Sequence, residues 1–259
     1  AASPLAAVFH LFVRDFSGML GGLCFAAIQG SGFDAQAKQW RYFADCANNV
    51  GLFLDLSAPE FTSQAGFLVV LCLGRVAGAL TGVAGGASRS ALTHYFALRD
   101  NAADIAAKEG SQETAATLVG MVAGYLVTHG SAGLPMLQWV IFALLTALHL
   151  TANARAVRCL RVKSLNACRA RLLHSHFSSG PSKGKARFLT PQQVAQMEPL
   201  LPWPAWAIDA GALVGASSSH VRITIGAHLS DLLRFKGLEA LPALVREYRG
   251  DSYMLNVEG

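Results

Sequence analysis

Residues 65–87 form an apolar run that is long enough to cross a lipid bilayer, which requires about 20 residues. Glycine recurs at every fourth position of this run, at Gly74, Gly78, Gly82 and Gly86. Positions four apart lie along one face of a helix. In lipid, such a line of small side chains lets two helix backbones approach closely. The pattern therefore predicts a membrane helix that packs through its glycines, with a tight crossing in a soluble protein as the alternative.

The composition also favours a membrane protein. Hydrophobic residues make up 53% of the chain and charged residues 14%, whereas about 25% of residues are charged in an average soluble domain. An alanine-rich soluble bundle is the alternative. The five cysteines are scattered singly, which predicts free, mostly buried thiols rather than a disulfide framework or a zinc site.

Two further apolar segments follow, residues 114–129 and 134–153, joined by a short turn. If these two and 65–87 each cross the membrane once, the connection 88–113 and the basic run 155–187 lie on the same side. That basic run contains nine Lys or Arg and no Asp or Glu. The arrangement agrees with the positive-inside rule.

Ionisable side chains interrupt the apolar segments near the start of the chain. Residues 5–29 contain Arg14 and Asp15, which either neutralise each other inside a bundle or mark a break between two helices. Arg75 lies inside the 65–87 run, so we expect it to face a partner carboxylate or a wet cavity.

The chain divides into three predicted regions: a helical membrane core at 1–157, a basic helix and flexible linker at 158–189, and a partial soluble module at 190–259. Thr190 and Pro191 are typical of a helix start, and residues 219–229 alternate like a strand. The predicted fold class is an all-α polytopic membrane helical bundle with a small, incomplete α+β C-terminal region.

Residues 33–56 are predicted to be helical and carry a polar stripe. Asp34, Lys38, Arg41, Asp45 and Asn48 are spaced so that they share one helix face. In a chain with so few charges, this stripe predicts either a polar interior that lines a ligand site or an ordinary solvated face.

Residues 99–114 hold a second group of polar side chains. Asp104 and Lys108 are four apart and are expected to pair, Gln112 continues their line, and Glu113 follows it. Gly110 predicts that one helix ends there and that another begins. The segment is either a ligand site or a polar connector.

A third group is the sequence GGASR at 85–89. A turn at these residues would bind an anion through backbone N–H groups and Arg89. The sequence contains no phosphate-binding loop, zinc-protease motif or nucleophile elbow. We therefore expect no metal site, no certain cofactor and no enzymatic activity.

Five segments together resemble the Root UV-B Sensitive family, which is also called the vitamin B6 photoprotection and homoeostasis family. These are SGMLG (17–21), DAQAKQWRYFAD (34–45), VAGGASRSALT (83–93), NAADIAAKEGSQET (101–114) and TALHLTANARAV (146–157). The resemblance covers about residues 9–200, although Asn49 stands where the family usually has Asp. It implies roles in vitamin B6 homoeostasis and UV-B tolerance, and for some members a plastid location and action in pairs. It transfers no catalytic residue.

The leading hypothesis is an integral protein of an organelle membrane, plastid or else mitochondrial or endomembrane, that binds or transports a small anionic metabolite. Pyridoxal phosphate or a related vitamer is a candidate ligand. The alternative is a scaffold that pairs with a paralogue, with itself or with a larger complex, and a weaker one is an enzyme that uses pyridoxal phosphate. The lipid bilayer is an expected partner and nucleic acid is not.

Overall fold

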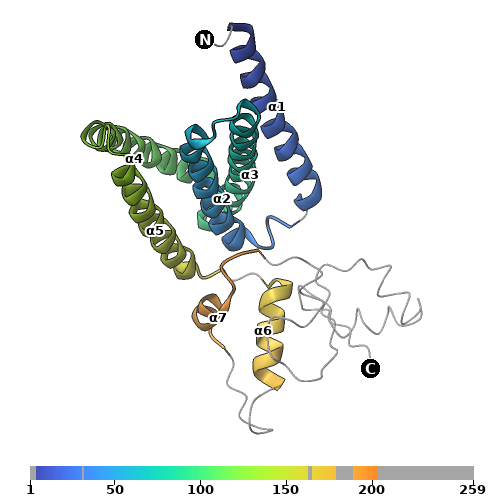
Figure 1. The fold of residues 1–259 in the computed structure, drawn as a ribbon. Coiled ribbons are helices and arrows are strands. Elements are labelled where there is room, and N and C mark those ends of the chain that lie inside the picture. Colours follow the sequence, from blue (N-terminus) through green and yellow to red (C-terminus); the bar gives the residue numbers. More distant parts are fainter. Residues whose placement is uncertain (1–3, 31, 163–164, 179–188, 203–259) are drawn as a thin grey trace, which may run out of the picture.

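The computed structural model describes residues 4–30, 32–162, 165–178 and 189–202, and these residues are helical, with no strand among them (Figure 1). In chain order the elements are α1 (Pro4–Gln29), α2 (Ala37–Ser57), the 3-10 helix η1 (Ala58–Glu60), α3 (Gln64–Phe96), α4 (Ala102–Gly130), α5 (Pro135–Cys159), α6 (Ala167–Ser178) and α7 (Pro191–Met197). The predicted strand at 219–229 lies outside the described residues.

The helix boundaries have local causes. Ser63 caps α3 because its side chain accepts a hydrogen bond from the Gly66 backbone N–H at 3.0 Å. Proline stands at the start of α5, as Pro135, and of α7, as Pro191, where its missing N–H costs no helical hydrogen bond. Thr190 completes a capping box with Gln193, so the predicted helix start at 190–191 is confirmed.

Helices α2 and α3 run antiparallel and pack tightly through small residues. A Cβ atom at Gly51 would lie 3.3 Å from the Gly74 carbonyl oxygen and 3.6 Å from Ala77 Cβ. The Thr81 hydroxyl donates to the Ala44 carbonyl at 3.4 Å across the same contact. Close backbone approach therefore holds this pair together.

Helix α1 lies on the other side of α3 and runs parallel to it. Gly18 of α1 contacts Arg75, and Gly21 contacts Val76, so both sequences advance in the same direction along the contact. Further along α1, an aromatic cluster joins the end of this helix to the start of α2. The ring centroids of Phe25, Phe33, Trp40 and Phe43 lie 5.1–5.9 Å apart.

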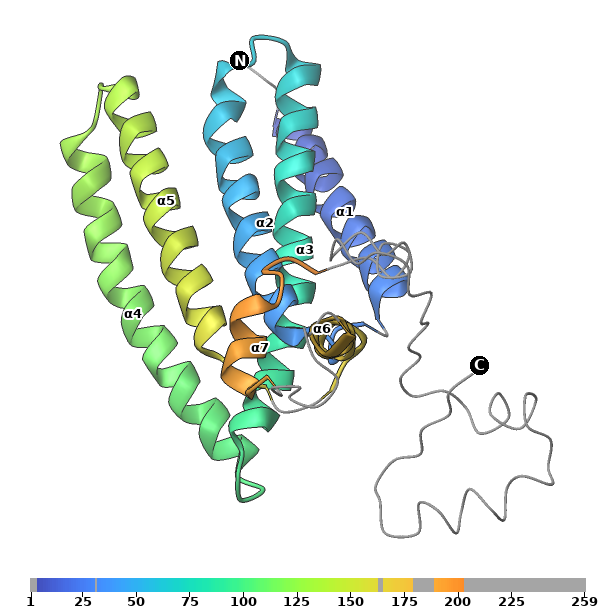
Figure 2. The ribbon, with the colours of Figure 1, turned by 90° about the horizontal axis from the view of Figure 1, so that it is seen from below.

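The pair α4 and α5 extends away from this three-helix unit (Figure 2). Helix α5 packs antiparallel against α2. The rings of Phe53 and Trp139 meet edge to face with centroids 5.7 Å apart, and Asn49 is hydrogen-bonded to His149 at 2.8 Å. Helix α4 has no buried residue. The Tyr95 hydroxyl donates to the Arg161 carbonyl at 2.6 Å. That bond brings the connection after α3 and the basic run after α5 to the same end of the helices, as the sequence predicts.

Three helices are long and apolar enough to cross a membrane: α1, α3 and α5. Their apolar side chains are largely exposed in this chain, for example Leu20 and Leu23 of α1 and Leu144 and Leu148 of α5. The predicted span at 114–129 forms the second half of α4, which is not among the three.

Four local predictions are wrong, and one of the two alternatives for Arg14 and Asp15 is excluded. Helix α4 continues through Gly110, α5 ends at Cys159 so that the basic run is not one helix, and residues 85–89 lie inside α3 and form no anion-binding turn. The predicted polar helix starts at Ala37, so Asp34 lies in the preceding turn. Arg14 and Asp15 mark no break, because α1 is continuous across them.

Candidate functional site

A polar cleft of about 140 Å³ opens between α1, α2 and α3. Glycines form part of its wall, and its polar side chains come from all three helices. Its lining residues are Arg14, Asn48, Gly51, Leu52, Asp55, Leu71, Gly74, Arg75 and Gly78. A larger hollow of about 460 Å³ at the turn before α5 is lined by Gly133–Leu137 and Val140, and without convergent polar side chains it has nothing to orient a ligand.

Two guanidinium groups at this cleft share one carboxylate. Asp15 lies 2.9 Å from an Arg14 nitrogen and 3.3 Å from Arg75 Nε. Arg75 reaches α1 because Gly18 leaves room for it: a Cβ at Gly18 would lie 2.6 Å from Arg75 Cγ. The expectation that Arg75 faces a carboxylate or a cavity is therefore confirmed on both counts.

Asp55 stands on the α2 side of the cleft. Its Oδ1 lies 2.7 Å from the position that a Cβ on Gly74 would occupy. Within the part of the chain that the structure describes, the Asp55 carboxylate has no hydrogen bond or ion pair. Only glycine at position 74 leaves space for the carboxylate in this position.

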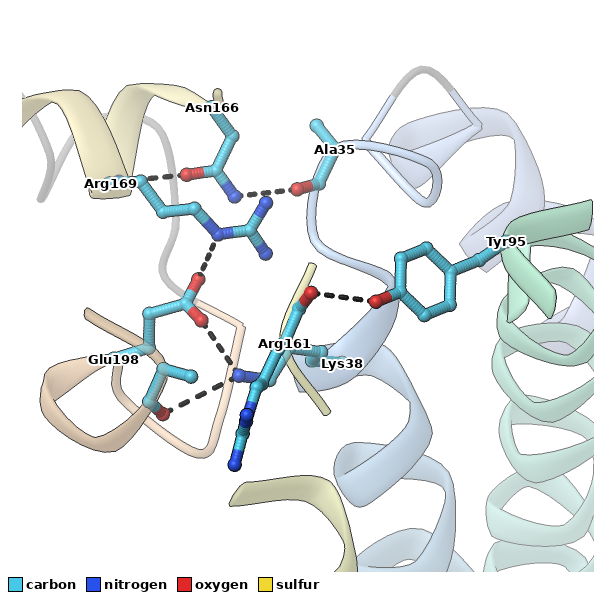
Figure 3. A network of polar contacts seen from close by, with 8 residues as sticks. Ala35, Lys38, Tyr95, Arg161, Asn166, Arg169 and Glu198 are labelled. Atoms are coloured by element: carbon cyan, nitrogen blue, oxygen red, sulfur yellow. Dashed lines mark hydrogen bonds and ion pairs between the residues drawn. The ribbon is translucent and has the colours of Figure 1, made fainter. Parts of the chain in front are cut away.

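A second polar group lies at the opposite end of α2 from Asp55, where Lys38, Arg169 and Glu198 meet (Figure 3). Glu198, just after α7, accepts from Lys38 Nζ at 2.7 Å and from Arg169 Nε at 2.6 Å. The three side chains are 2–6% exposed. Asn166 completes the junction by donating to the Ala35 carbonyl at 2.6 Å and accepting from the Arg169 backbone N–H at 2.8 Å. We call Lys38, Arg169 and Glu198 the ion triad.

The ion triad affects the thiol beside it. Burial, together with the nearby Glu198 carboxylate, raises the pKa of Cys168 to about 11, because both disfavour the thiolate. The cysteines of the described residues are free, as predicted, but most of them are not buried: Cys168 is buried, Cys46 and Cys72 are half-buried, and Cys24 and Cys159 are exposed.

Arg89 joins α3 to α4. Its guanidinium lies 2.9 Å from Glu109 and 2.7 Å from Glu113. These exposed ion pairs link the end of α3 to the first half of α4, beside Gly110.

The remaining predicted residues lie apart from the cleft. Arg41 and Asp45 form a long ion pair at 3.8 Å on α2, and Asn49 donates to both the Asp45 carbonyl and His149 Nδ1. Asp34, Asp104, Lys108 and Gln112 are exposed, and the expected pair between Asp104 and Lys108 is not formed.

Of the four predicted packing glycines, Gly74 is buried against α2, while a Cβ on Gly78, Gly82 or Gly86 would meet no atom within 4 Å. Sequence reasoning also missed Asp55, Arg169 and Glu198. For Asp55 a local signal existed, since it continues the polar stripe of α2 by seven residues beyond Asn48. For Arg169 and Glu198 no local spacing indicated the partner.

Residues 1–180 match the family model described as the vitamin B6 photo-protection and homoeostasis domain. The protein root UVB sensitive 3 of Arabidopsis thaliana is 44% identical over 98% of this chain and 56% of its own length. RUS family member 1 of Dictyostelium discoideum is 38% identical over 78% of this chain and 38% of its own length. Root UVB sensitive 5 of Arabidopsis thaliana is 28% identical over 99% of this chain and 47% of its own length.

The chain thus spans about half the length of the curated relatives it matches. No solved structure matches it. The family model covers most of the described helices, from α1 to α6, including the cleft and two members of the ion triad. The chain therefore belongs to the root UVB sensitive family, the proteins that carry the vitamin B6 photo-protection and homoeostasis domain.

Proposed function

We propose that the protein is an integral membrane protein that supports vitamin B6 homoeostasis and UV-B tolerance by binding or transporting a small anionic metabolite at the cleft between α1, α2 and α3. We further propose an organelle membrane as its location and no catalytic activity of its own. One relative, root UVB sensitive 2 of Arabidopsis thaliana, is named chloroplastic, which supports a plastid.

The observation that carries this proposal is the position of the charges. Arg14, Asp15 and Arg75 lie within α1 and α3, two helices that are apolar enough to cross a membrane. An ionisable side chain in such a helix is costly and usually serves a ligand or ion path. Here Arg14 and Arg75 line one cleft and share the Asp15 carboxylate instead of facing separate partners.

The expected ligand has an anionic group because the α1 and α3 side of the cleft has more cations than their shared carboxylate neutralises. Arg14 and Arg75 both use Asp15. A guanidinium offers several donors in a planar fork, which suits a phosphate or carboxylate better than a single ammonium does. Pyridoxal phosphate and its relatives carry such a phosphate.

An uptake assay tests the proposal. We expect purified protein in liposomes to bind or accumulate a radiolabelled vitamin B6 phosphate, and Arg75→Gln to reduce the signal at least about tenfold, as loss of a charge-assisted contact of about 1.5–3 kcal/mol would. Arg99→Gln, an exposed arginine between α3 and α4, is the matched control. If the wild-type protein shows no flux and no binding, the proposal is ruled out.

A second candidate function is a membrane scaffold that pairs with a relative or a second copy. The free face at Gly78, Gly82 and Gly86 favours it, because no side chain of the described residues fills the space over these glycines. Replacing Gly82 and Gly86 by Leu separates the two functions, because neither of these glycines lines the cleft. The scaffold predicts that partner co-purification is lost while vitamer binding survives, and the ligand-binding function predicts no change in either.

A further inference from the structure

We propose that the ligand of the cleft is a small zwitterion, with its anionic group on the arginine side and a protonated nitrogen at Asp55. This inference rests on the proposed function, since it names the chemical class of the molecule that the same cleft would take. It goes further in assigning a cation-binding role to a carboxylate that the anion hypothesis does not use.

The two sides of the cleft carry opposite unbalanced charges. On the α1 and α3 side, Arg14 and Arg75 share the single carboxylate of Asp15 at 2.9 and 3.3 Å. On the α2 side, the Asp55 carboxylate has no ion pair within the described residues. The α1 and α3 side therefore has a net excess of one positive charge, and the α2 side has one negative charge without a counter-ion.

These two charges do not neutralise each other directly. Arg14 and Arg75 both pair with Asp15, and neither lies within 4.0 Å of Asp55. Arg75 extends toward α1 across Gly18, whereas Asp55 lies over Gly74 from the α2 side. All three side chains line the cleft.

The polarity of the space suits such a molecule, and its volume holds only part of one as large as a vitamin B6 phosphate. A volume of about 140 Å³ corresponds to about five water molecules at liquid density. Asn48 adds an uncharged donor and acceptor to the lining. An anion alone would leave Asp55 unpaired beside it, and a cation alone would leave the guanidinium excess, so a ligand with both charges satisfies the site best.

The vitamin B6 phosphates provide matched probes. Pyridoxamine 5′-phosphate and pyridoxine 5′-phosphate differ only in an ammonium that replaces a hydroxyl, and pyridoxamine lacks the phosphate. Equilibrium binding to the detergent-solubilised full chain at pH 7 is measured for all three. We expect pyridoxamine 5′-phosphate to bind about fivefold or more tightly than pyridoxine 5′-phosphate, and pyridoxamine to bind most weakly.

The variant Asp55→Asn keeps the side-chain shape and removes its charge. Because Asp55 is exposed and unpaired in the described structure, this change leaves no buried charge behind. We expect it to abolish the preference for the ammonium and to leave binding of pyridoxine 5′-phosphate unchanged. Glu60→Gln removes an exposed carboxylate outside the cleft and is expected to preserve the preference.

The outcomes separate the two proposals. If the wild-type protein binds none of the probes, the proposed function fails and the zwitterion inference with it. If it binds both phosphates equally, or if Asp55→Asn retains the full preference for the ammonium, the zwitterion inference is overturned while the proposed function stands.

Discussion

Glu198 shows how much a single side chain contributes at the junction of α2, α6 and α7. Both of its carboxylate oxygens are used, one by Lys38 and one by Arg169, and the carboxylate is almost completely buried. Burying three charges costs several kcal/mol for each, and the short contacts offset that cost only while all partners are present. The ion triad therefore makes the junction sensitive to the loss of one charge.

We expect Glu198→Gln to destabilise the protein by about 3–5 kcal/mol, because it leaves Lys38 and Arg169 buried without a counter-charge. Thermal unfolding in detergent, followed by intrinsic fluorescence, measures the effect. Glu60→Gln, at an exposed carboxylate, should unfold at the wild-type temperature. Equal unfolding temperatures for the two variants would contradict the importance of the triad.

The thiol of Cys168 reports on the same junction. Because its pKa is raised to about 11, the reactive thiolate is scarce at pH 8. In single-cysteine variants, we predict slow maleimide labelling of Cys168 and fast labelling of the exposed Cys159, measured by mass spectrometry. Adding Glu198→Gln should speed up only the labelling of Cys168, whereas equal rates for both thiols in the wild-type background would argue against the buried junction.

At the scale of helices, the glycines of α1 and α3 fall into two groups. Gly18 and Gly74 lie against neighbouring side chains, whereas Gly82 faces open space. Glycine therefore affects stability differently at these positions. In a helix it costs about 1 kcal/mol of stability relative to alanine, and this cost is offset only where the missing side chain allows a close contact.

We predict opposite effects for two alanine substitutions. Gly18→Ala places a methyl group 2.6 Å from Arg75 Cγ and 3.2 Å from the Arg75 carbonyl oxygen, and should cost about 1–3 kcal/mol. Gly82→Ala meets no atom within 4 Å and should stabilise the chain by about 0.5–1 kcal/mol. Thermal unfolding of both variants, side by side, measures this. A stabilising Gly18→Ala would be inconsistent with the observed contact of α1 and α3.

The helices themselves could be predicted from the apolar runs, and the exact breaks could not. Gly110 predicts a helix end, but one glycine inside a helix is a small cost, and Arg89 pairs with a glutamate on either side of it, Glu109 and Glu113. The break after Cys159 has no Pro or Gly to mark it. Asn166, which caps the start of α6 through the Arg169 N–H, was an available signal for the new helix.

At the scale of the whole molecule, large apolar side chains remain exposed along α1, α4 and α5. Soluble monomers seldom expose continuous apolar surface of this kind. A surrounding of lipid hydrocarbon provides a physical reason for it, and three of the helices have the necessary length and composition.

We expect a cysteine placed in the middle of α5 to be shielded from water. In a cysteine-free background, Leu144→Cys should resist a water-soluble maleimide in native membranes, although Leu144 is 65% exposed in the isolated chain. Cys159, restored alone at the end of α5, should label readily. Equal labelling of both positions, or a monodisperse protein in buffer without detergent, would contradict a membrane location.

The candidate site was predictable only in part. The expectation for Arg75 follows from the need of a charge inside an apolar run for a partner, and spacing identifies only side chains that share one face of one helix. It cannot identify partners from distant segments, such as Lys38 and Glu198, which lie 160 residues apart. Lys38 was expected on a shared face with Asp34, yet it bonds to Glu198, because folding brings α7 to the start of α2.

The directions of the helices constrain the topology by parity. Helices α1, α3 and α5 run in the same direction, so if all three cross the membrane, the chain must return across it twice between them. The segments that make these returns are α2 and α4, because they connect the three helices. If the three apolar helices traverse the bilayer, α2 carries Lys38, Asp45 and Asp55 back through the same layer, the first two buried and Asp55 at the cleft. Five passages put the first residues of α1 and the basic segment after α5 in different compartments.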